Sequence, residues 1–244
     1  MIHFRLTINF ATSSSVMINN VWDRSSYPRK TCLWSGGCWL WNHPHPPLVI
    51  EALGTRPDFY WNDLKYKPRD HHALITHFIV ARTTARPASV RLRGSDTPSI
   101  KTVLGTGADR IIVSQIGSAD AVLRVVEANR YSPPGKRGLG PRRANQELSV
   151  SVQIANVDTR VLADELVAVE GFDSIVIGLA DLSNSIGYLG QLDPPEVVVA
   201  FGTIIEKTNS AGKFVGMGLG ADEDFATRQY SGELGCKSVA TFLT

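Results

Sequence analysis

A carboxylate follows directly on a short apolar run in the last third of the chain. Residues 172–177 read FDSIVI, which is typical of a buried strand, and Gly178 ends the run. Asp181 comes next, followed by small and polar residues that can begin a helix. At the carboxyl end of a parallel strand, a carboxylate and backbone N–H groups face one space, where they can bind a cation and an anion. We therefore predict a ligand site at Asp181.

Strand-like and helix-like segments alternate along the chain, which predicts a parallel sheet with crossover helices. Strands are expected at 37–41, 58–63, 88–92, 110–115, 148–154, 172–177, 214–217 and 238–243, and the second of them ends in an acid, Asp63. Helices are expected at 48–53, 70–81, 99–104, 118–130, 159–168, 194–211 and within 222–235. Asp70 and Ser118 suit the N-caps of two of these helices. Eight strands favour an α/β fold of the (β/α)8 TIM barrel type. An open doubly wound sheet is the alternative, although no G-x-G-x-x-G follows the first strand.

Residues 1–34 differ from the remainder of the chain, because they mix polar runs and show no sustained period. We interpret 1–34 as an irregular N-terminal extension and 35–244 as the barrel. A TIM barrel usually has about 250 residues, and 210 remain here (244 − 34). We therefore expect short loops and no helix after the last strand.

Composition limits the class of protein. The net charge of +2 gives no argument for a nucleic-acid or membrane partner, and no apolar run is long enough to span a bilayer. The three cysteines, Cys32, Cys38 and Cys236, have no metal-ligand spacing. This favours a reduced, cytoplasmic protein with ordinary globular composition.

Several motifs occur in an order that points to one family. They are GCWL at 37–40, VRLRGSD at 90–96 with IKTVL after it, YSPPGKRGLG at 131–140, VSVQI at 150–154, GFDSIVIGLADLSNSIGY at 171–188, and LGCKSVA at 234–240. Together they resemble the HpcH/HpaI aldolase family of class II pyruvate aldolases. That family includes 2-dehydro-3-deoxyglucarate aldolase and 4-hydroxy-2-oxoheptanedioate aldolase, and the fungal macrophomate synthase is similar to it.

The resemblance implies a carbon–carbon lyase that acts on small 2-oxo acids through an enolate. It implies a divalent metal, Mg²⁺ or Mn²⁺, held by two carboxylates and stabilising the developing charge. Arg91 falls on the substrate-binding arginine, Gln153 on a glutamine near the keto oxygen, and Asp181 on one of the two metal carboxylates. The structural alternatives are an ion pair inside the barrel for Arg91, a core-edge position for Gln153, and a helix N-cap for Asp181.

Three further positions follow from the resemblance. Gly178 and Ala180 fall where backbone N–H groups meet the substrate carboxylate, although small residues at a tight turn would look the same. Trp39 falls on a tryptophan of the pocket wall, with a plain core position as the alternative.

The chain departs from the family pattern at its catalytic groups. Ala155 stands at the position of the second metal carboxylate, and Gly105 at that of the acid that pairs with the catalytic histidine. Lys65, Tyr66 and Lys67 replace the E-H-G sequence that contains that histidine. A single carboxylate would bind Mg²⁺ weakly. Lys65 either supplies positive charge in place of a metal or, in the simpler interpretation, extends into solvent. Tyr66 is a poor base near neutral pH but can donate a hydrogen bond.

Three hypotheses remain open: an aldolase-type lyase with a degenerate metal and base site, a divergent enzyme that forms carbon–carbon bonds or decarboxylates as macrophomate synthase does, and a non-catalytic relative. Family members assemble as trimers of dimers that exchange their last helix. Because that helix is not expected here, we predict a weaker homo-oligomer.

Overall fold

The computed structural model describes residues 39–42, 47–54, 59–66, 70–138, 148–156, 163–218 and 238–240, all within one compact unit, Trp34–Thr244. The predicted extension 1–34, the predicted helix within 222–235 and the expectation about residues after the last strand lie outside the described residues.

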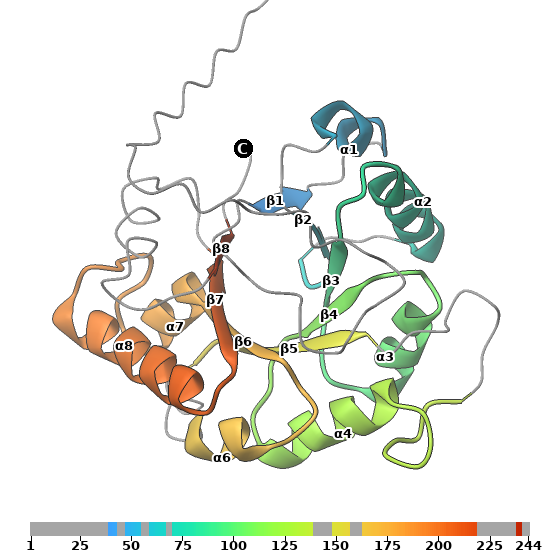
Figure 1. The fold of residues 1–244 in the computed structure, drawn as a ribbon. Helices are drawn as coiled ribbons and strands as arrows, with labels where there is room; N and C mark the ends of the chain where they lie inside the picture. The colour runs from blue at the N-terminus through green and yellow to red at the C-terminus, as the bar shows by residue number, and fades with distance from the viewer. Residues whose placement is uncertain are drawn as a thin grey trace, which may run out of the picture. The chain divides into compact units, whose positions relative to one another are not determined.

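The described strands form one parallel sheet, and their order in the sheet is their order in the chain. They are β1 Trp39–Asn42, β2 Phe59–Asp63, β3 Ala88–Leu92, β4 Arg110–Val113, β5 Ser149–Ile154, β6 Ser174–Gly178, β7 Phe214–Gly218 and β8 Ser238–Ala240. The last strand contacts the first, so the sheet curls into a ring with the helices around it (Figure 1). The (β/α)8 barrel predicted from the sequence is confirmed.

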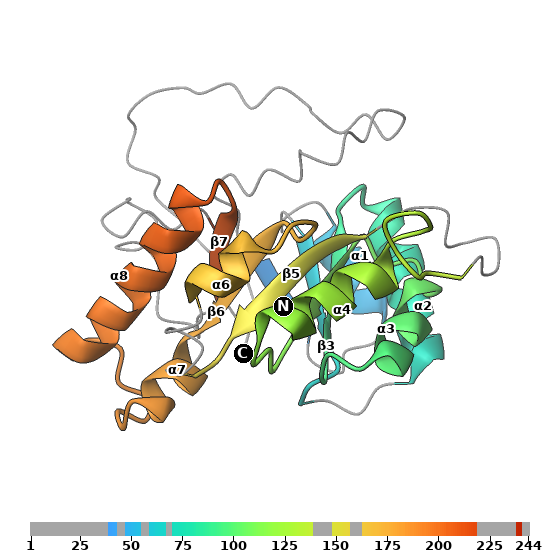
Figure 2. The ribbon, with the colours of Figure 1, turned by 90° about the horizontal axis from the view of Figure 1, so that it is seen from below.

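Helices cross from one strand to the next on the outside of the sheet, as Figure 2 shows for α4 and α6 over β5 and β6. They are α1 Pro47–Leu53, α2 His71–Thr83, α3 Thr97–Leu104, α4 Ala119–Asn129, α6 Ala163–Ala168, α7 Leu179–Ser185 and α8 Pro195–Ser210. The starts of α2, α3 and α4 are set by N-cap side chains, since Asp70, Asp96 and Ser118 each accept a hydrogen bond from the backbone N–H three residues on. The predicted caps at 70 and 118 are therefore confirmed.

The fourth and sixth strands differ from their predicted bounds for reasons that the structure shows. The fourth ends at Val113 rather than at 115, and Gln115 has a positive φ of 58°, which takes the chain out of the sheet. The sixth begins at Ser174 rather than at 172, because the Asp173 carboxylate accepts hydrogen bonds from the Val150 N–H at 2.7 Å and from a serine hydroxyl at 2.9 Å at the start of β5.

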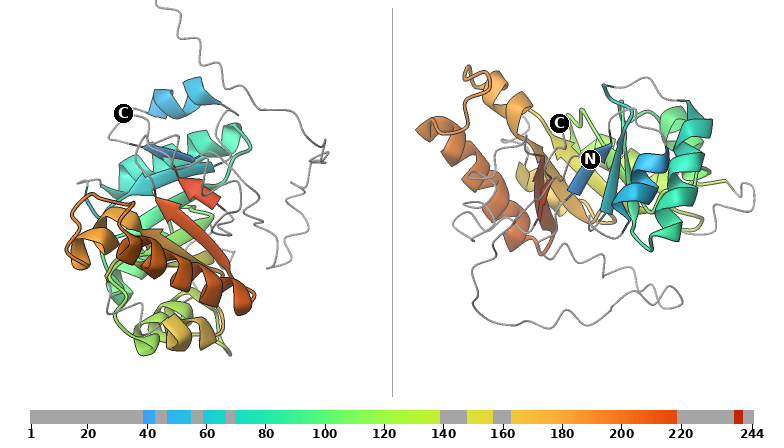
Figure 3. Two further views of the ribbon diagram at one scale, coloured as in Figure 1. Left: turned by 90° about the vertical axis from the view of Figure 1, so that its left-hand side faces the viewer. Right: turned by 90° about the horizontal axis from the view of Figure 1, so that it is seen from above.

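The core has two parts, one on each face of the curled sheet. The larger cluster joins the outward-facing strand residues to the helices, for instance Val150, Val152 and Ile154 of β5 with Phe201 of α8, which runs beside β7 (Figure 3). The smaller cluster contains Phe59, Trp61, Ile112 and Val176, and Phe214 packs against it. It combines residues from β2, β4 and β6, which is the layering of a filled barrel interior.

The carboxyl end of this interior is polar. Asp63 is the last residue of β2 and is the register partner of Arg91 on β3, while Gln153 lies near the end of β5 and Gly178 ends β6. The sheet therefore delivers the predicted site residues to a common end of the barrel. No helix among the described residues has the length and hydropathy needed to cross a membrane.

Candidate active site

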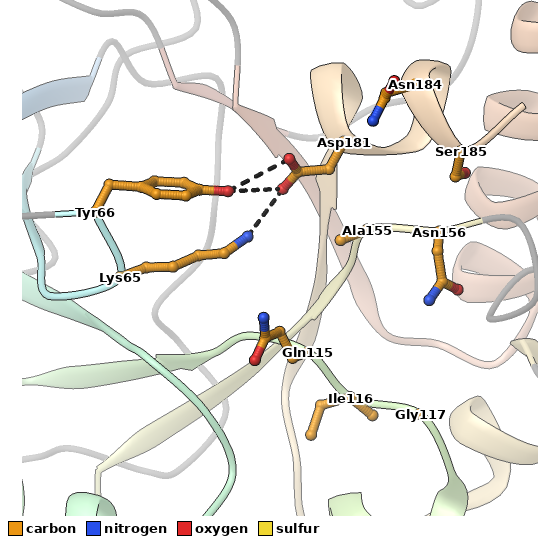
Figure 4. Close-up of a pocket in the computed structure, with 10 residues that line it drawn as sticks. All are labelled: Lys65, Tyr66, Gln115, Ile116, Gly117, Ala155, Asn156, Asp181, Asn184 and Ser185. Carbon is orange, nitrogen blue, oxygen red and sulfur yellow. Dashed lines mark hydrogen bonds and ion pairs between the residues drawn. The ribbon is translucent and has the colours of Figure 1, made fainter. Parts of the chain in front are cut away.

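A pocket of about 450 Å³ opens at the carboxyl end of the barrel. Residues that follow β2, β4, β5 and β6 line it: 65–66, 115–117, 155–156, and 181, 184 and 185 (Figure 4). Strand ends that are far apart in the sequence thus converge on one space, where TIM-barrel enzymes place their chemistry. The predicted ligand site at Asp181 coincides with this pocket.

Asp181 is in the first turn of α7 and carries the negative charge of the pocket wall. Its Oδ2 accepts a hydrogen bond from Lys65 Nζ at 2.9 Å, and the Tyr66 hydroxyl lies 3.4 Å from both carboxylate oxygens. Figure 4 shows the lysine and the tyrosine reaching across the pocket toward the carboxylate. The Lys65 side chain is 10 % exposed and that of Asp181 37 %. The interpretation of Lys65 as a solvated surface residue is therefore wrong.

Arg91 forms a bidentate ion pair with Asp63 inside the barrel. Its Nε donates to Asp63 Oδ1 at 2.9 Å and its Nη2 to Oδ2 at 2.7 Å, and the two side chains are 3 % and 0 % exposed. The guanidinium also lies 5.1 Å from the ring of Tyr66 and 5.6 Å from that of Trp61. The ion pair that was the structural alternative for Arg91 is present, and it fixes the guanidinium directly behind a residue that lines the pocket.

Gln153 connects this ion pair to the Asp181 side of the site. Its Oε1 accepts a hydrogen bond from Ser114 Oγ at 2.9 Å and lies 3.5 Å from Arg91 Nη1. A Cβ added at Gly178 would come within 2.8 Å of Gln153 Nε2 and 3.5 Å of Asp181 Oδ2. The glutamine amide group and the carboxylate therefore both adjoin Gly178, and only the missing side chain at this position leaves them room.

The structure brings four of the six predicted site residues together and leaves Ala180 outside the pocket lining. Asp181 lines the pocket, while Arg91, Gln153 and Gly178 lie in the connected layer next to it. Ala180 is exposed and is not among the residues that line the pocket. Trp39 belongs to β1, but its side chain lies outside the described part of the structure, so its predicted place in the pocket wall stays a prediction.

The profile of one protein family, HpcH/HpaI aldolase/citrate lyase, matches residues 62–228, which includes the carboxyl end of every strand that contributes to the pocket. The chain belongs to this family. The resemblance found in the sequence motifs is confirmed.

Curated relatives and a solved structure agree with the assignment to the HpcH/HpaI family. A hydroxypyruvate/pyruvate aldolase from Pseudomonas aeruginosa is 32% identical over 218 residues, which are 82% of this chain and 80% of the relative. A 4-hydroxy-2-oxo-heptane-1,7-dioate aldolase from Shigella sonnei is 32% identical over 82% of each chain. The crystal structure of the citrate synthase SbnG is 28% identical, has a TM-score of 0.76, and covers 86% of this chain and 87% of its own.

The donor set of the pocket does not fit the metal site that the family resemblance implies. Ala155 lines the pocket where a second carboxylate was expected, and the one carboxylate there, Asp181, already binds an ammonium group. Among the described residues, no three histidine, cysteine, aspartate or glutamate side chains lie close enough to hold one metal ion. Mg²⁺ and Mn²⁺ prefer several oxygen ligands, and affinity follows the charge of the ligand set. Asp181 by itself is a poor site for either ion.

Sequence reasoning missed two residues of the polar layer. Asp63 was recognised as an acid at a strand end but received no role, although its position beside Arg91 on the neighbouring strand was a usable signal. Ser114, which orients the Gln153 amide, gave no signal because a serine after a strand is common. Gly105 ends α3 as its C-cap, so the acid that the family resemblance pairs with the catalytic histidine has no counterpart at this position.

Proposed function

We propose that this protein is a carbon–carbon lyase that cleaves or forms the bond beside the methyl carbon of a pyruvate unit in small 2-oxo acids. The observation that carries the proposal is the pocket at the carboxyl end of an HpcH/HpaI-family barrel, lined by Lys65, Tyr66 and Asp181. The names of the two aldolase relatives, each about a third identical over most of its length, support the same substrate class.

The proposed cleavage of a 4-hydroxy-2-oxo acid needs one base, one acid and charge stabilisation. The base takes the proton of the 4-hydroxyl group, the C3–C4 bond breaks, and an aldehyde leaves. The electron pair of that bond stays on C3 as the pyruvate enolate, which then takes a proton at C3. The pair formed by the Asp181 carboxylate and the Tyr66 hydroxyl is placed to accept and return that proton.

The buried polar layer holds the oxo-acid end in this proposal. Arg91 is charged and fixed by Asp63, and Gln153 has its oxygen occupied by Ser114. Its amide N–H groups therefore point toward the Gly178 side, where a substrate oxygen can accept them. The backbone N–H group at Gly178 is proposed to receive the substrate carboxylate, whereas Ala180, which does not line the pocket, is given no role.

Two expectations from the sequence remain proposals. They are a cytoplasmic location and a homo-oligomer weaker than that of relatives. No step of the proposed reaction passes through a metal, because the donor set does not fit one.

The test is release of pyruvate from a 4-hydroxy-2-oxo acid and from oxaloacetate, measured with a lactate dehydrogenase couple, with and without added Mn²⁺. The wild-type protein is expected to release pyruvate above the uncatalysed rate. Asp181→Asn is expected to lower kcat by about 100-fold or more, the usual contribution of a positioned acid–base group.

The matched control is Asp164→Asn, which removes a carboxylate that is also hydrogen-bonded to a lysine, Lys207, at 2.7 Å, but on the outer helices. It is expected to leave pyruvate release unchanged. Absence of pyruvate release by the wild-type protein from either substrate, under both conditions, would contradict the proposed function and favour a non-catalytic relative.

A further inference from the structure

The pocket holds a positive charge where a metal-dependent aldolase would hold a cation. Ala155 leaves one carboxylate, Asp181, and the Nζ of Lys65 lies 2.9 Å from its Oδ2. A divalent ion arriving at Asp181 would have to displace this ammonium group and would find no second carboxylate among the residues that line the pocket. The presence of the lysine and the absence of a second carboxylate therefore both lower the affinity of the pocket for a divalent cation.

Lys65 is held in place from both ends. Its backbone N–H donates to Asp63 Oδ1 at 2.8 Å, the same oxygen that accepts from Arg91 Nε. At the other end its Nζ binds Asp181 and lies 4.7 Å from the ring centre of Tyr66. With its side chain 10 % exposed, the lysine is a fixed charge in a largely water-excluded position, which is the arrangement that stabilises developing negative charge most strongly.

We propose that the Lys65 ammonium group, positioned by Asp181 and Asp63, takes the place of a divalent cation and binds the carboxylate and enolate oxygens of a 2-oxo acid without metal. An ammonium group has three N–H donors. Among the described residues, Asp181 is the acceptor that Lys65 Nζ reaches, and the pocket lies on the open side of this pair (Figure 4). The inference rests on the proposed function and assigns stabilisation of the negative charge of the enolate to Lys65.

The charges of the pocket predict opposite effects for the two halves of the pair. Lys65→Met leaves the Asp181 carboxylate alone in the pocket, where it repels an anionic ligand. Asp181→Asn leaves the ammonium group without its counter-charge, which strengthens attraction of the same ligand. A metal site on Asp181 would behave differently, since loss of the carboxylate would then abolish anion binding.

The experiment is isothermal titration of the full-length protein with oxalate, a dianion with the shape of the pyruvate enolate, in excess EDTA. The wild-type protein is expected to bind oxalate, Lys65→Met to bind it at least about tenfold more weakly, and Asp181→Asn to bind it as tightly as wild type or more tightly. Lys207→Met removes a lysine from the exposed pair with Asp164 and is the matched control, with unchanged affinity. Circular dichroism melts of each variant separate loss of binding from loss of folding.

Three results would overturn the inference. Oxalate binding that requires Mn²⁺ would assign the charge to a metal. Oxalate binding in EDTA that is lost in Asp181→Asn would show that the Lys65 ammonium group does not carry the attraction. Treatment with borohydride and pyruvate that covalently modifies Lys65, detected by peptide mass spectrometry, would show an imine in place of an ionic contact. If oxalate binding and pyruvate release both require Mn²⁺, the inference fails while the proposed lyase function stands; if pyruvate is never released, the proposed function fails.

Discussion

The buried ion pair between Asp63 and Arg91 is expected to contribute strongly to the free energy of unfolding. The substitution Asp63→Asn tests this contribution. The asparagine oxygen can keep the position of Oδ1, which accepts from Arg91 Nε and from the Lys65 backbone. Its amide nitrogen replaces Oδ2 and faces Arg91 Nη2, so a donor meets a donor at a place now spanned by a 2.7 Å bond. Both side chains are 3 % exposed or less, so solvent does not screen the loss.

Removing one partner of a buried pair costs about 3–5 kcal/mol. For a domain of this size each kcal/mol lowers Tm by about 2–4 °C, so Asp63→Asn is expected to lower Tm by about 6–20 °C. Differential scanning calorimetry and urea unfolding measure this change. The exposed pair of Asp164 and Lys207 is the control, and Asp164→Asn is expected to change the unfolding free energy by less than about 1 kcal/mol. Equal, small effects for the two variants would refute the assignment of Asp63 as the buried counter-charge of Arg91.

Three further changes test the surrounding scaffold. Asp96→Ala removes the N-cap of α3 and is expected to cost about 0.5–2 kcal/mol in urea unfolding. The hydrogen bond that the carboxylate accepts from the Ser99 backbone N–H holds the pKa of Asp96 below its ordinary value, so the stability it contributes is present above about pH 4 and is lost as the pH falls through the folded pKa. The Asp96→Asn variant should not show this loss at low pH. Asn129→Ala removes a fully buried amide that donates to the Leu148 carbonyl oxygen and accepts from the Leu148 N–H, and is expected to cost about 2–3 kcal/mol by the same method. A cost under about 0.5 kcal/mol would show that α4 is not tied there to the residue that precedes β5. Gly171→Ala is expected to lower Tm in calorimetry, because φ is +94° and a Cβ would come within 2.5 Å of Val126 Cγ1; an unchanged Tm would contradict that close approach.

Much of the barrel could be predicted because each of its elements has a local cause. The strand 88–92 was predicted at its observed bounds from the five residues ASVRL, and the starts of the helices near 70 and 118 from their capping side chains. The start of the sixth strand was misplaced because a contact with another strand decided it. Asp173 leaves the sheet because its carboxylate caps the start of β5, and no local pattern at 172–173 contains that information.

The location of the candidate site could be predicted from the sequence, but the contacts between its side chains could not. The apolar run that ends at Gly178 placed Asp181 at the carboxyl end of the barrel, which the pocket confirms. The contact between Lys65 and Asp181 joins residues 116 positions apart, and the lysine ammonium group lies 4.7 Å from the ring centre of Tyr66. A lysine in isolation is most often solvated, so the sequence favoured the interpretation that the structure overturns.

The most direct measurement of the central claim is exchange of the pyruvate methyl protons with D₂O, followed by proton NMR in the presence of EDTA. Exchange requires enolate formation in the pocket and nothing else. The account predicts exchange by the wild-type protein and its loss in Lys65→Met, with Lys207→Met unchanged. Wild-type protein that exchanges no protons, or Lys65→Met that exchanges them at the wild-type rate, would contradict the account.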